Sequence, residues 1–247
     1  MFLFSCGTQQ ISVRWAVASD AERLAELYSA VQIRAEQCHK VLNAKDGSFA
    51  KRGGMFEISS VEDLRRILRD KDEKVLTGEY NGTVCGLLWF GTAKADTFAD
   101  LVPLPEQREA AERMARARAK GSCGYAKEII SLGADTPREM PVVLFYAMMN
   151  EYVKNGTSLT VGEVYTIDKY QTQGQIFESG LLNNASYSFL LRCGGVELGR
   201  TRQKKVDLES YSVWKTPHIL MWNTKDAMEI IRLELANNEW EIKENEN

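Results

Sequence analysis

The order of strand-like and helix-like segments constrains the fold of this chain more than any single residue does. Alternating apolar residues over positions 11–16 predict a strand. Apolar residues at helical spacing over positions 21–31 predict an amphipathic helix that packs on a neighbouring element. A second, shorter helix is expected after Ser60, because Asp63 follows it at the spacing of a capping box.

A β-hairpin is the next expected element. Asn81 and Gly82 lie between two apolar segments and favour the positive φ angles that a tight hairpin turn requires. Further patterns predict strands over 129–132, 159–164, 196–206 and 211–222, and helices over 106–120, 142–155, 184–193 and 226–237. This order predicts a mixed sheet with helices on both faces.

The length of the chain bears on its domain organisation. At 247 residues it exceeds the usual size of one domain and falls short of two full ones. With 44% hydrophobic and 26% charged residues, it can bury a sizeable core. No internal repeat and no dividing linker is evident, so we expect a single enlarged domain over residues 1–247.

Composition argues against several classes of function. A net charge of −3 gives no electrostatic reason to expect a nucleic-acid partner. The chain has two histidines, which disfavours a histidine-built metal site, and no run of about 18 apolar residues that would span a membrane. Its cysteines are widely spaced and form no Cys-x-x-Cys pair, which indicates reduced thiols in a cytoplasmic protein: Cys6, Cys38, Cys85, Cys123 and Cys193.

Four segments carry a resemblance to a known family. They are Ile11-x-x-Arg-x-Ala with the helix after it, Glu79-Tyr-Asn-Gly-x-Val-x-Gly, Glu128-Ile-x-x-Leu-x-Ala, and Asn184-x-x-Tyr-x-x-Leu-Leu-x-x-x-Gly-Val. In this order they resemble motifs of the GNAT superfamily of N-acetyltransferases, over about residues 11–215. Each motif alone is weak, and their agreement in order carries the resemblance.

The resemblance implies a fold and a donor. The fold would be α/β (α+β), with a GNAT-like mixed, mostly antiparallel central sheet, a core over 11–222, insertions at 94–124 and 168–183, and a C-terminal helix over 226–237. The donor would be acetyl-CoA or another acyl-CoA as co-substrate, without a metal. Its thioester arm would lie between the fourth and fifth core strands, held by the main chain of Leu132, Gly133 and Ala134 and contacted by Asn184.

The segment expected to bind the donor's phosphates departs from the family pattern. It reads Thr-Pro-Arg-Glu-Met-Pro over 136–141 and has no glycine, although glycine lets backbone N–H groups approach phosphate closely. Arg138 supplies a positive charge, whereas Glu139 adds repulsion and the prolines remove N–H donors. A GNAT-like binding or interaction module that has lost this loop is therefore the alternative function.

Two residues are candidates for acid–base chemistry. The resemblance places Glu128 where family members keep a general base, although an ordinary carboxylate at a strand end is the other interpretation. The family's usual acid, a tyrosine, aligns with Leu191, which has no proton to donate. Tyr187, one helical turn earlier, is the substitute candidate, or else it packs against the sheet. Asn184 equally suits a helix cap.

We therefore expect an acyl-CoA-dependent N-acyltransferase that acylates the amine of a small molecule, most simply as an N-acetyltransferase. A donor carried on a carrier protein is a further alternative. The insertions and the final helix are expected to govern acceptor choice or subunit contact, and a homodimer is one way to cover the apolar face of that helix.

Overall fold

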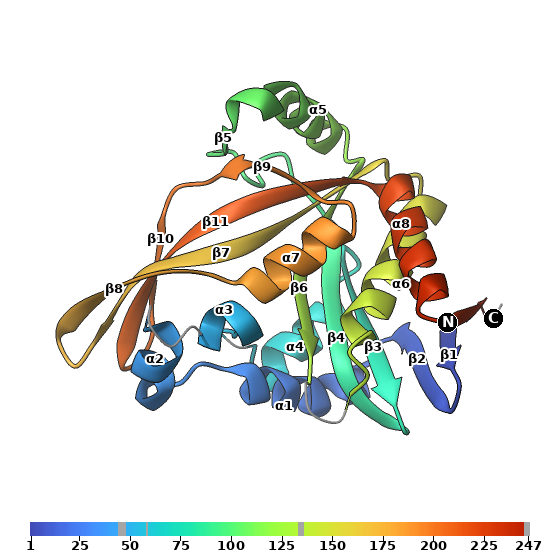
Figure 1. The fold of residues 1–247 in the computed structure, drawn as a ribbon, viewed down its shortest axis with the longest axis horizontal. Coiled ribbons are helices and arrows are strands. Elements are labelled where there is room, and N and C mark those ends of the chain that lie inside the picture. Colours follow the sequence, from blue (N-terminus) through green and yellow to red (C-terminus); the bar gives the residue numbers. More distant parts are fainter. Residues whose placement is uncertain (44–47, 58, 133–135, 245–247) are drawn as a thin grey trace.

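A computed structural model gives the fold of residues 1–43, 48–57, 59–132 and 136–244 (Figure 1). Its strands are β1 (Phe2–Cys6), β2 (Gln9–Trp15), β3 (Glu73–Tyr80), β4 (Thr83–Thr92), β5 (Val102–Pro103), β6 (Cys123–Ser131), β7 (Leu159–Thr172), β8 (Gln175–Leu182), β9 (Val196–Arg200), β10 (Lys204–Asp207), β11 (Tyr211–Asn223) and β12 (Glu241–Glu244). Its α-helices are α1 (Ala21–Val31), α2 (Ala35–Leu42), α3 (Ser48–Arg52), α4 (Val61–Ile67), α5 (Arg108–Ala119), α6 (Met140–Lys154), α7 (Asn184–Arg192) and α8 (Thr224–Asn237).

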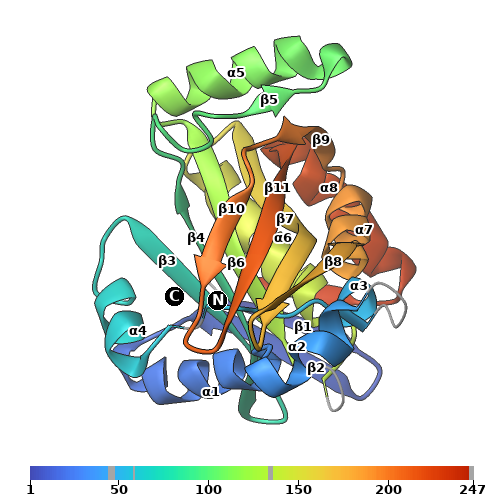
Figure 2. The same ribbon diagram turned by 90° about the vertical axis from the view of Figure 1, so that its left-hand side faces the viewer.

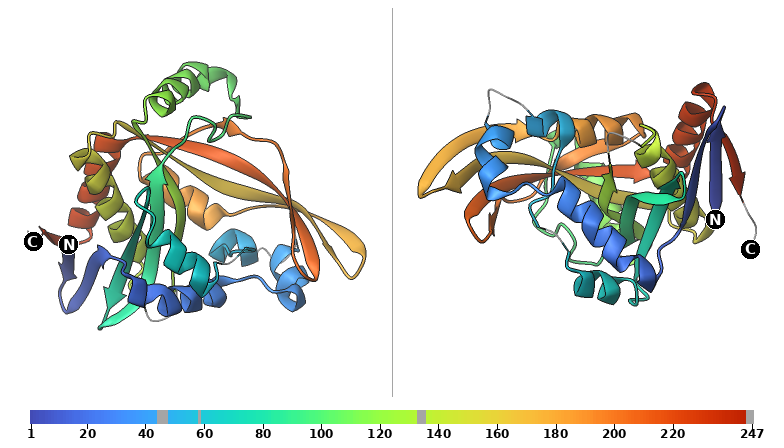
Figure 3. Two further views of the ribbon diagram at one scale, coloured as in Figure 1. Left: turned by 180° about the vertical axis from the view of Figure 1, so that it is seen from behind. Right: turned by 90° about the horizontal axis from the view of Figure 1, so that it is seen from below.

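The strands of the described residues form one sheet in the order β12-β1-β2-β3-β4-β6-β7-β11-β9-β5, with β8 beside β7 and β10 beside β11. Of these neighbouring pairs, β6 and β7 run parallel and the others antiparallel. Helices α6 and α8 cover one face, and α1 and α4 cover the other (Figure 3). The predicted fold class, a mixed and mostly antiparallel sheet between helices, is confirmed.

Local signals in the sequence have the predicted effects. Asn81 and Gly82 both take positive φ angles, 51° and 74°, at the turn between β3 and β4. The Ser60 side chain accepts a hydrogen bond from the Asp63 N–H at 3.1 Å and caps α4.

Helix α6 is apolar nearly all round because it lies between the sheet and α8. Its residues from Val142 to Met149 are all buried. The first turn comes close to β3 and β4 at Gly78 and Gly86, and a Cβ atom on Gly86 would lie 2.8 Å from Met140 Cγ. Glycine on these strands therefore sets how closely the start of α6 approaches the sheet.

Several elements differ from the predictions. Strands β1 and β12 pair with each other and bring the two ends of the described chain together. Helices α2 and α3 lie between the two predicted helices at 21–31 and after Ser60, where no element was predicted, and residues 196–206 divide into β9 and β10. The N-terminal segment gave too short an apolar alternation to identify β1 beforehand; β1 forms a hairpin with β2, and its second partner, β12, lies at the far end of the described chain.

Both insertions contain regular structure. Residues 94–124 hold β5, α5 and the start of β6, and α5 covers one end of the sheet (Figure 2). The polar stretch at 168–183 is not a loop: β7 continues through it and turns at Gln173 and Gly174, with φ angles of 50° and 76°, into β8. Here β7 lies between β8 and β11, and only the turn of the hairpin projects beyond the helices (Figure 1).

Candidate functional site

The central strands β6 and β7 part halfway along the sheet. They pair only over Cys123–Ala126 and Leu159–Gly162. On the other side of β6, Phe90 and Trp89 lie opposite Ala126 and Glu128, so Lys127 is an extra residue that forms a β-bulge. A bulge bends its strand, and β6 leaves β7 at this residue.

Tyr152 of α6 braces the sheet at this point. Its hydroxyl donates a hydrogen bond to the Gly91 carbonyl at 2.6 Å and accepts one from the Tyr125 N–H at 3.0 Å. The ring lies against Gly124, where a Cβ atom would be 2.5 Å from it. One buried phenol thereby connects β4 to β6 immediately before the bulge.

Replacing Tyr152 with phenylalanine keeps the ring and removes the hydroxyl, and it should destabilise the protein. The Tyr125 N–H and the Gly91 carbonyl would lose this buried partner, which costs about 1–3 kcal/mol. Urea unfolding followed by circular dichroism measures the change. Tyr80→Phe is a matched control, since Tyr80 is only partly buried, and it should leave the unfolding midpoint almost unchanged. An unchanged midpoint for Tyr152→Phe would contradict this role.

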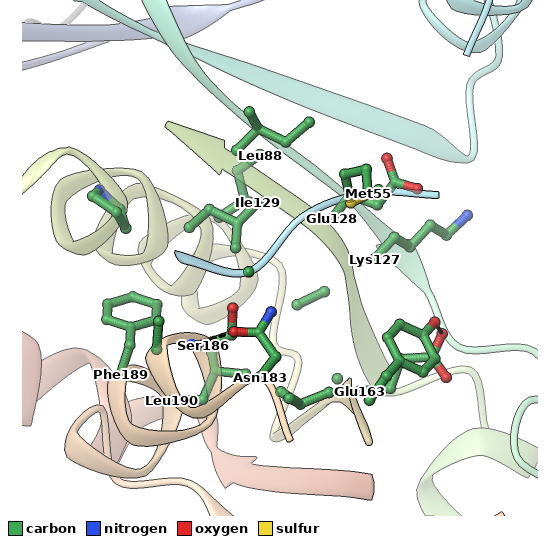
Figure 4. A pocket seen from close by; sticks show the side chains of 18 of the residues that line it. Met55, Leu88, Lys127, Glu128, Ile129, Glu163, Asn183, Ser186, Phe189 and Leu190 are labelled. Atoms are coloured by element: carbon green, nitrogen blue, oxygen red, sulfur yellow. Dashed lines mark hydrogen bonds between the residues drawn. The ribbon is translucent and has the colours of Figure 1, made fainter. Parts of the chain in front are cut away.

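A cavity of about 500 Å³ opens where the two strands separate (Figure 4). One wall comes from residues 127–131 of β6 and another from residues 162–165 of β7. The first turns of α7 and the segment after α3 complete it, and these two helices lie side by side (Figure 1). The lining includes Phe145 of α6 on one face of the sheet and Glu128, which contacts α1 on the other face, so the cavity reaches both faces.

The edge of β6 that faces this cavity offers main-chain groups. Leu132 donates its N–H to the Cys85 carbonyl at 2.9 Å, continuing the ladder with β4. Hydrogen-bonded pairs alternate along an antiparallel ladder, so Ile130 and Glu128 also direct their N–H and C=O groups to β4. Ile129 and Ser131, between them, direct theirs toward the cavity.

Glu128 is a partly buried carboxylate of the β6 wall. It lines the cavity and accepts a hydrogen bond from the Tyr28 hydroxyl of α1. Burial raises the pKa of Glu128, while the Tyr28 hydrogen bond and the charge of Lys215 oppose the rise. Such a carboxyl is better matched to accepting a proton near neutral pH than an exposed one.

A second carboxylate, Glu163 of β7, lies on the same face. Its Oε1 accepts hydrogen bonds from the hydroxyls of Tyr125, at 3.2 Å, and Tyr165. Its Oε2 is buried without a hydrogen bond among the described residues, and Lys204 Nζ is 3.9 Å away. In a regular strand, Tyr125 and Glu128 would point to opposite faces, so the bulge brings Glu128 to the face of Tyr125 and Glu163.

Helix α7 presents its N-terminal part to the cavity. Asn183, not Asn184, caps it, because the Asn183 side chain accepts the Ser186 N–H at 3.1 Å. Asn183 and Ser186 line the cavity together with Phe189 and Leu190, whereas Asn184 is exposed and is not among the lining residues. The alternative interpretation of Asn184 as the cap is thus wrong by one residue, because the helix begins with Asn184 itself.

Tyr187 points away from this cavity. Its hydroxyl donates to Glu197 of β9 at 2.5 Å, and burial with the nearby Glu197 charge raises the pKa of Tyr187 to about 12. Glu197 is also 2.8 Å from His218 Nδ1, and His218 Nε2 is 2.7 Å from the Thr166 hydroxyl. The structure therefore places Tyr187 in a polar network beneath α7 and does not bring it to Glu128. Leu191 is 38% exposed.

Of the remaining predicted binding residues, the structure describes Leu132 and Arg138, and neither of these lines the cavity. Leu132 follows β6 and its N–H is taken by Cys85, so the groove is lined one to five residues earlier than predicted. Gly133 and Ala134 lie outside the described residues. The Arg138 side chain is exposed just before α6 and donates to Glu139 at 2.7 Å.

The sequence did not reveal most of the cavity-lining residues on the face of the sheet that carries Glu128. No motif marks Glu163, Lys215, Tyr125 or Tyr165. Each lies in a strand whose apolar alternation gave the only signal, and the bulge that brings Glu128 to their face leaves no trace in the pattern.

Membrane-spanning helices and metal-binding clusters are both absent from the described part of the chain. No helix is long and apolar enough to cross a membrane. No group of three or more His, Cys, Asp and Glu side chains there is arranged to hold a metal ion.

Comparison with solved structures relates this architecture to other proteins. An N-acetyltransferase from Staphylococcus aureus Mu50 superposes with a TM-score of 0.52 at 12% identity, over 87% of this chain and 98% of that one. The ribosomal-protein-S18-alanine N-acetyltransferase of Escherichia coli gives 0.50 at 8% identity, over 85% and 92%. An uncharacterized protein from Bacillus halodurans gives 0.50 at 14% identity, over 93% and 92%. No protein-family model and no curated protein sequence matches the chain. The fold is that of the GNAT N-acetyltransferases.

Proposed function

We propose that this protein is an acyl-CoA-dependent N-acyltransferase, most simply an N-acetyltransferase, that acylates the amine of a small molecule. The observation that carries the proposal is the cavity between β6 and β7, which combines an unpaired strand edge with the partly buried Glu128 carboxylate. The alternative, a binding module without donor site, predicts a groove filled by side chains. A cavity of about 500 Å³ in this groove argues against that alternative.

The residues present fit the arm of an acyl-CoA. Ile129 and Ser131 provide main-chain donors and acceptors along one side, and an extended amide-containing arm can add to such an edge as a strand does. Phe145, Phe189 and Leu190 provide apolar surface on the side of α6 and α7. When bound, the co-substrate supplies an acyl group activated as a thioester.

The phosphates of such a donor would meet the start of α6. Helix N-termini favour anions because their first N–H groups lack partners within the helix. Arg138, with its exposed guanidinium, is the cation at this point, and its contact with Glu139 is a surface ion pair that is weak in water. Arg138 can therefore exchange Glu139 for phosphate at small cost.

Glu128 is the proposed general base. An amine reacts as a nucleophile only in its neutral form, and it must lose a proton as the amide bond forms. The Glu128 carboxylate lies in the cavity wall, where it can accept that proton directly or through one water. Tyr28, buried behind it, keeps the carboxylate in place by its hydrogen bond.

The Tyr187→Phe variant tests whether Tyr187 acts as a general acid or has a structural role. Because the Tyr187 hydroxyl is bonded to Glu197 beneath α7, we expect kcat to change by less than about threefold, against the hundredfold or more typical of a lost general acid. Loss of a partner for Glu197 should instead lower the unfolding midpoint. Steady-state kinetics with the best acceptor measures kcat, and a hundredfold fall would restore Tyr187 as the acid.

The direct test of the proposed activity is turnover. The protein is incubated with acetyl-CoA and a panel of small amines, and free CoA and acetylated amine are quantified by liquid chromatography and mass spectrometry. A thiol-reactive dye is unsuitable because the chain has five free cysteines. Equal amounts of CoA and acetylated amine would support the proposal. Release of CoA at the same rate without any amine would indicate thioester hydrolysis and contradict it.

A further inference from the structure

Two neighbouring lysines lie at the β11 side of the cavity, where Lys215 lines the wall and Lys204 lies beside Lys215. Lys204 and Lys215 lie directly opposite each other on β10 and β11. Like charges at directly opposed positions of a sheet destabilise it. An anion that binds near both lysines would offset this repulsion.

Lys215 is held in the cavity wall. Its side chain is 12% exposed, it lines the cavity, and its Nζ lies over the Tyr165 ring at 4.3 Å from the ring centroid. Its carboxylate partner, Glu57, is 3.4 Å away and 67% exposed. The ammonium is therefore largely buried, while the group that neutralises it stands in solvent and can move away.

The ion pair of Lys204 with Glu163 is also loose. Its Nζ is 3.9 Å from Glu163 Oε2, beyond hydrogen-bond distance, and its side chain is 48% exposed. The other oxygen of Glu163 is already engaged by two tyrosine hydroxyls. The two ammonium groups thus have unused hydrogen-bond donors beside the cavity.

We infer that Lys215, with Lys204 beside it, binds a carboxylate of the acceptor, and that the acceptor is therefore an amino acid or a close amino-acid analogue. The inference rests on the proposed function, which places the reacting amine at Glu128. If the acceptor carried a second positive charge in place of this carboxylate, Lys215 would repel it. The packing of Lys215 on Tyr165 prevents its ammonium group from moving away. Glu57, being exposed, gives way to the incoming carboxylate.

Matched pairs of acceptors test this inference. Histidine and histamine, tyrosine and tyramine, and tryptophan and tryptamine each differ by one carboxylate. With the purified full-length protein and saturating acetyl-CoA, we expect the amino acid of at least one pair to have the lower KM. Lys215→Met should raise that KM by about 10- to 100-fold, as expected for a lost hydrogen bond to a charged group, and should leave the KM of the decarboxylated amine within about twofold.

Two variants control for charge and folding. Lys205→Met removes the same charge from the neighbouring strand β10, but Lys205 pairs with Asp207 at 2.6 Å and lies over Trp214, away from the cavity; its KM values should match those of the parent protein. Lys215→Arg keeps the cation and should retain the preference for the amino acid.

The possible outcomes separate this inference from the proposed function. If acetyl-CoA binds but decarboxylated amines are equal or better acceptors, or if no member of any pair is acetylated, the inference is wrong while donor binding stands. A preference that survives in Lys215→Met also overturns it. If acetyl-CoA does not bind the parent protein, the proposed function itself fails.

Discussion

Replacing Glu128 with glutamine should lower kcat by about 10²- to 10⁴-fold, the usual contribution of a general base. Glutamine keeps the shape and can still accept the Tyr28 hydrogen bond, so the fold and the donor site should persist. The amide cannot take up the proton of the attacking amine. Steady-state kinetics at saturating acceptor measures the effect, and binding of acetyl-CoA to the variant should remain within about threefold of the parent protein.

The pH profile gives the same prediction a second readout. Burial raises the pKa of Glu128, and a general base acts only when it is deprotonated. Activity of the parent protein should therefore fall as pH drops through this raised pKa, and the acidic limb should be missing from the residual activity of Glu128→Gln. Glu62→Gln, on the exposed surface of α4, is the matched control. Activity above one tenth of the parent value in Glu128→Gln would remove Glu128 from the mechanism.

Filling the cavity with a large side chain should abolish donor binding. Ser186 lies on the α7 side of the cavity, so Ser186→Trp places an indole in the space proposed for the arm of acyl-CoA. We expect at least a hundredfold rise in the Kd for acetyl-CoA, because a blocked arm loses its contacts to the strand edge as well as its apolar burial. Isothermal titration calorimetry measures the change.

The same helix provides the control. Ser188 is two residues further on, exposed and outside the cavity lining, so Ser188→Trp should bind acetyl-CoA as the parent protein does. Circular dichroism and the unfolding midpoint show whether both variants remain folded. Unimpaired binding by a folded Ser186→Trp would mean that the donor arm lies elsewhere.

Local signals were sufficient to predict most core elements. The Asn81-Gly82 turn and the Ser60 cap rest on contacts within a few residues, so the sequence pattern contains them directly. The resemblance to GNAT motifs supplied the mostly antiparallel sheet and the donor site between two core strands, which local patterns do not encode. Strand β1 was missed because its short apolar segment gives a weak pattern, and its pairing with β12, more than 230 residues away along the chain, leaves no local signal.

The candidate site was predictable only in part. Glu128 was identified by its motif, and the structure places it in a cavity wall. The position of Tyr187 on the helix was predicted, but which face of α7 meets the cavity depends on how the helix seats on β9 and β11, through Glu197 and His218. The place of Lys215 follows only from the register of β11 against β7, and that of Glu163 beside Glu128 only from the bulge at Lys127.

The most direct test of the central claim is the effect of acetyl-CoA on the unfolding temperature of the parent protein. A ligand that binds only the native state at 100 times its Kd stabilises it by about 2.7 kcal/mol, which for a chain of this length raises the midpoint by several degrees. We expect such a rise with acetyl-CoA, with Ser188→Trp behaving alike and Ser186→Trp showing none. No rise at millimolar acetyl-CoA, and none with longer acyl-CoA donors, would contradict an acyl-CoA site between β6 and β7.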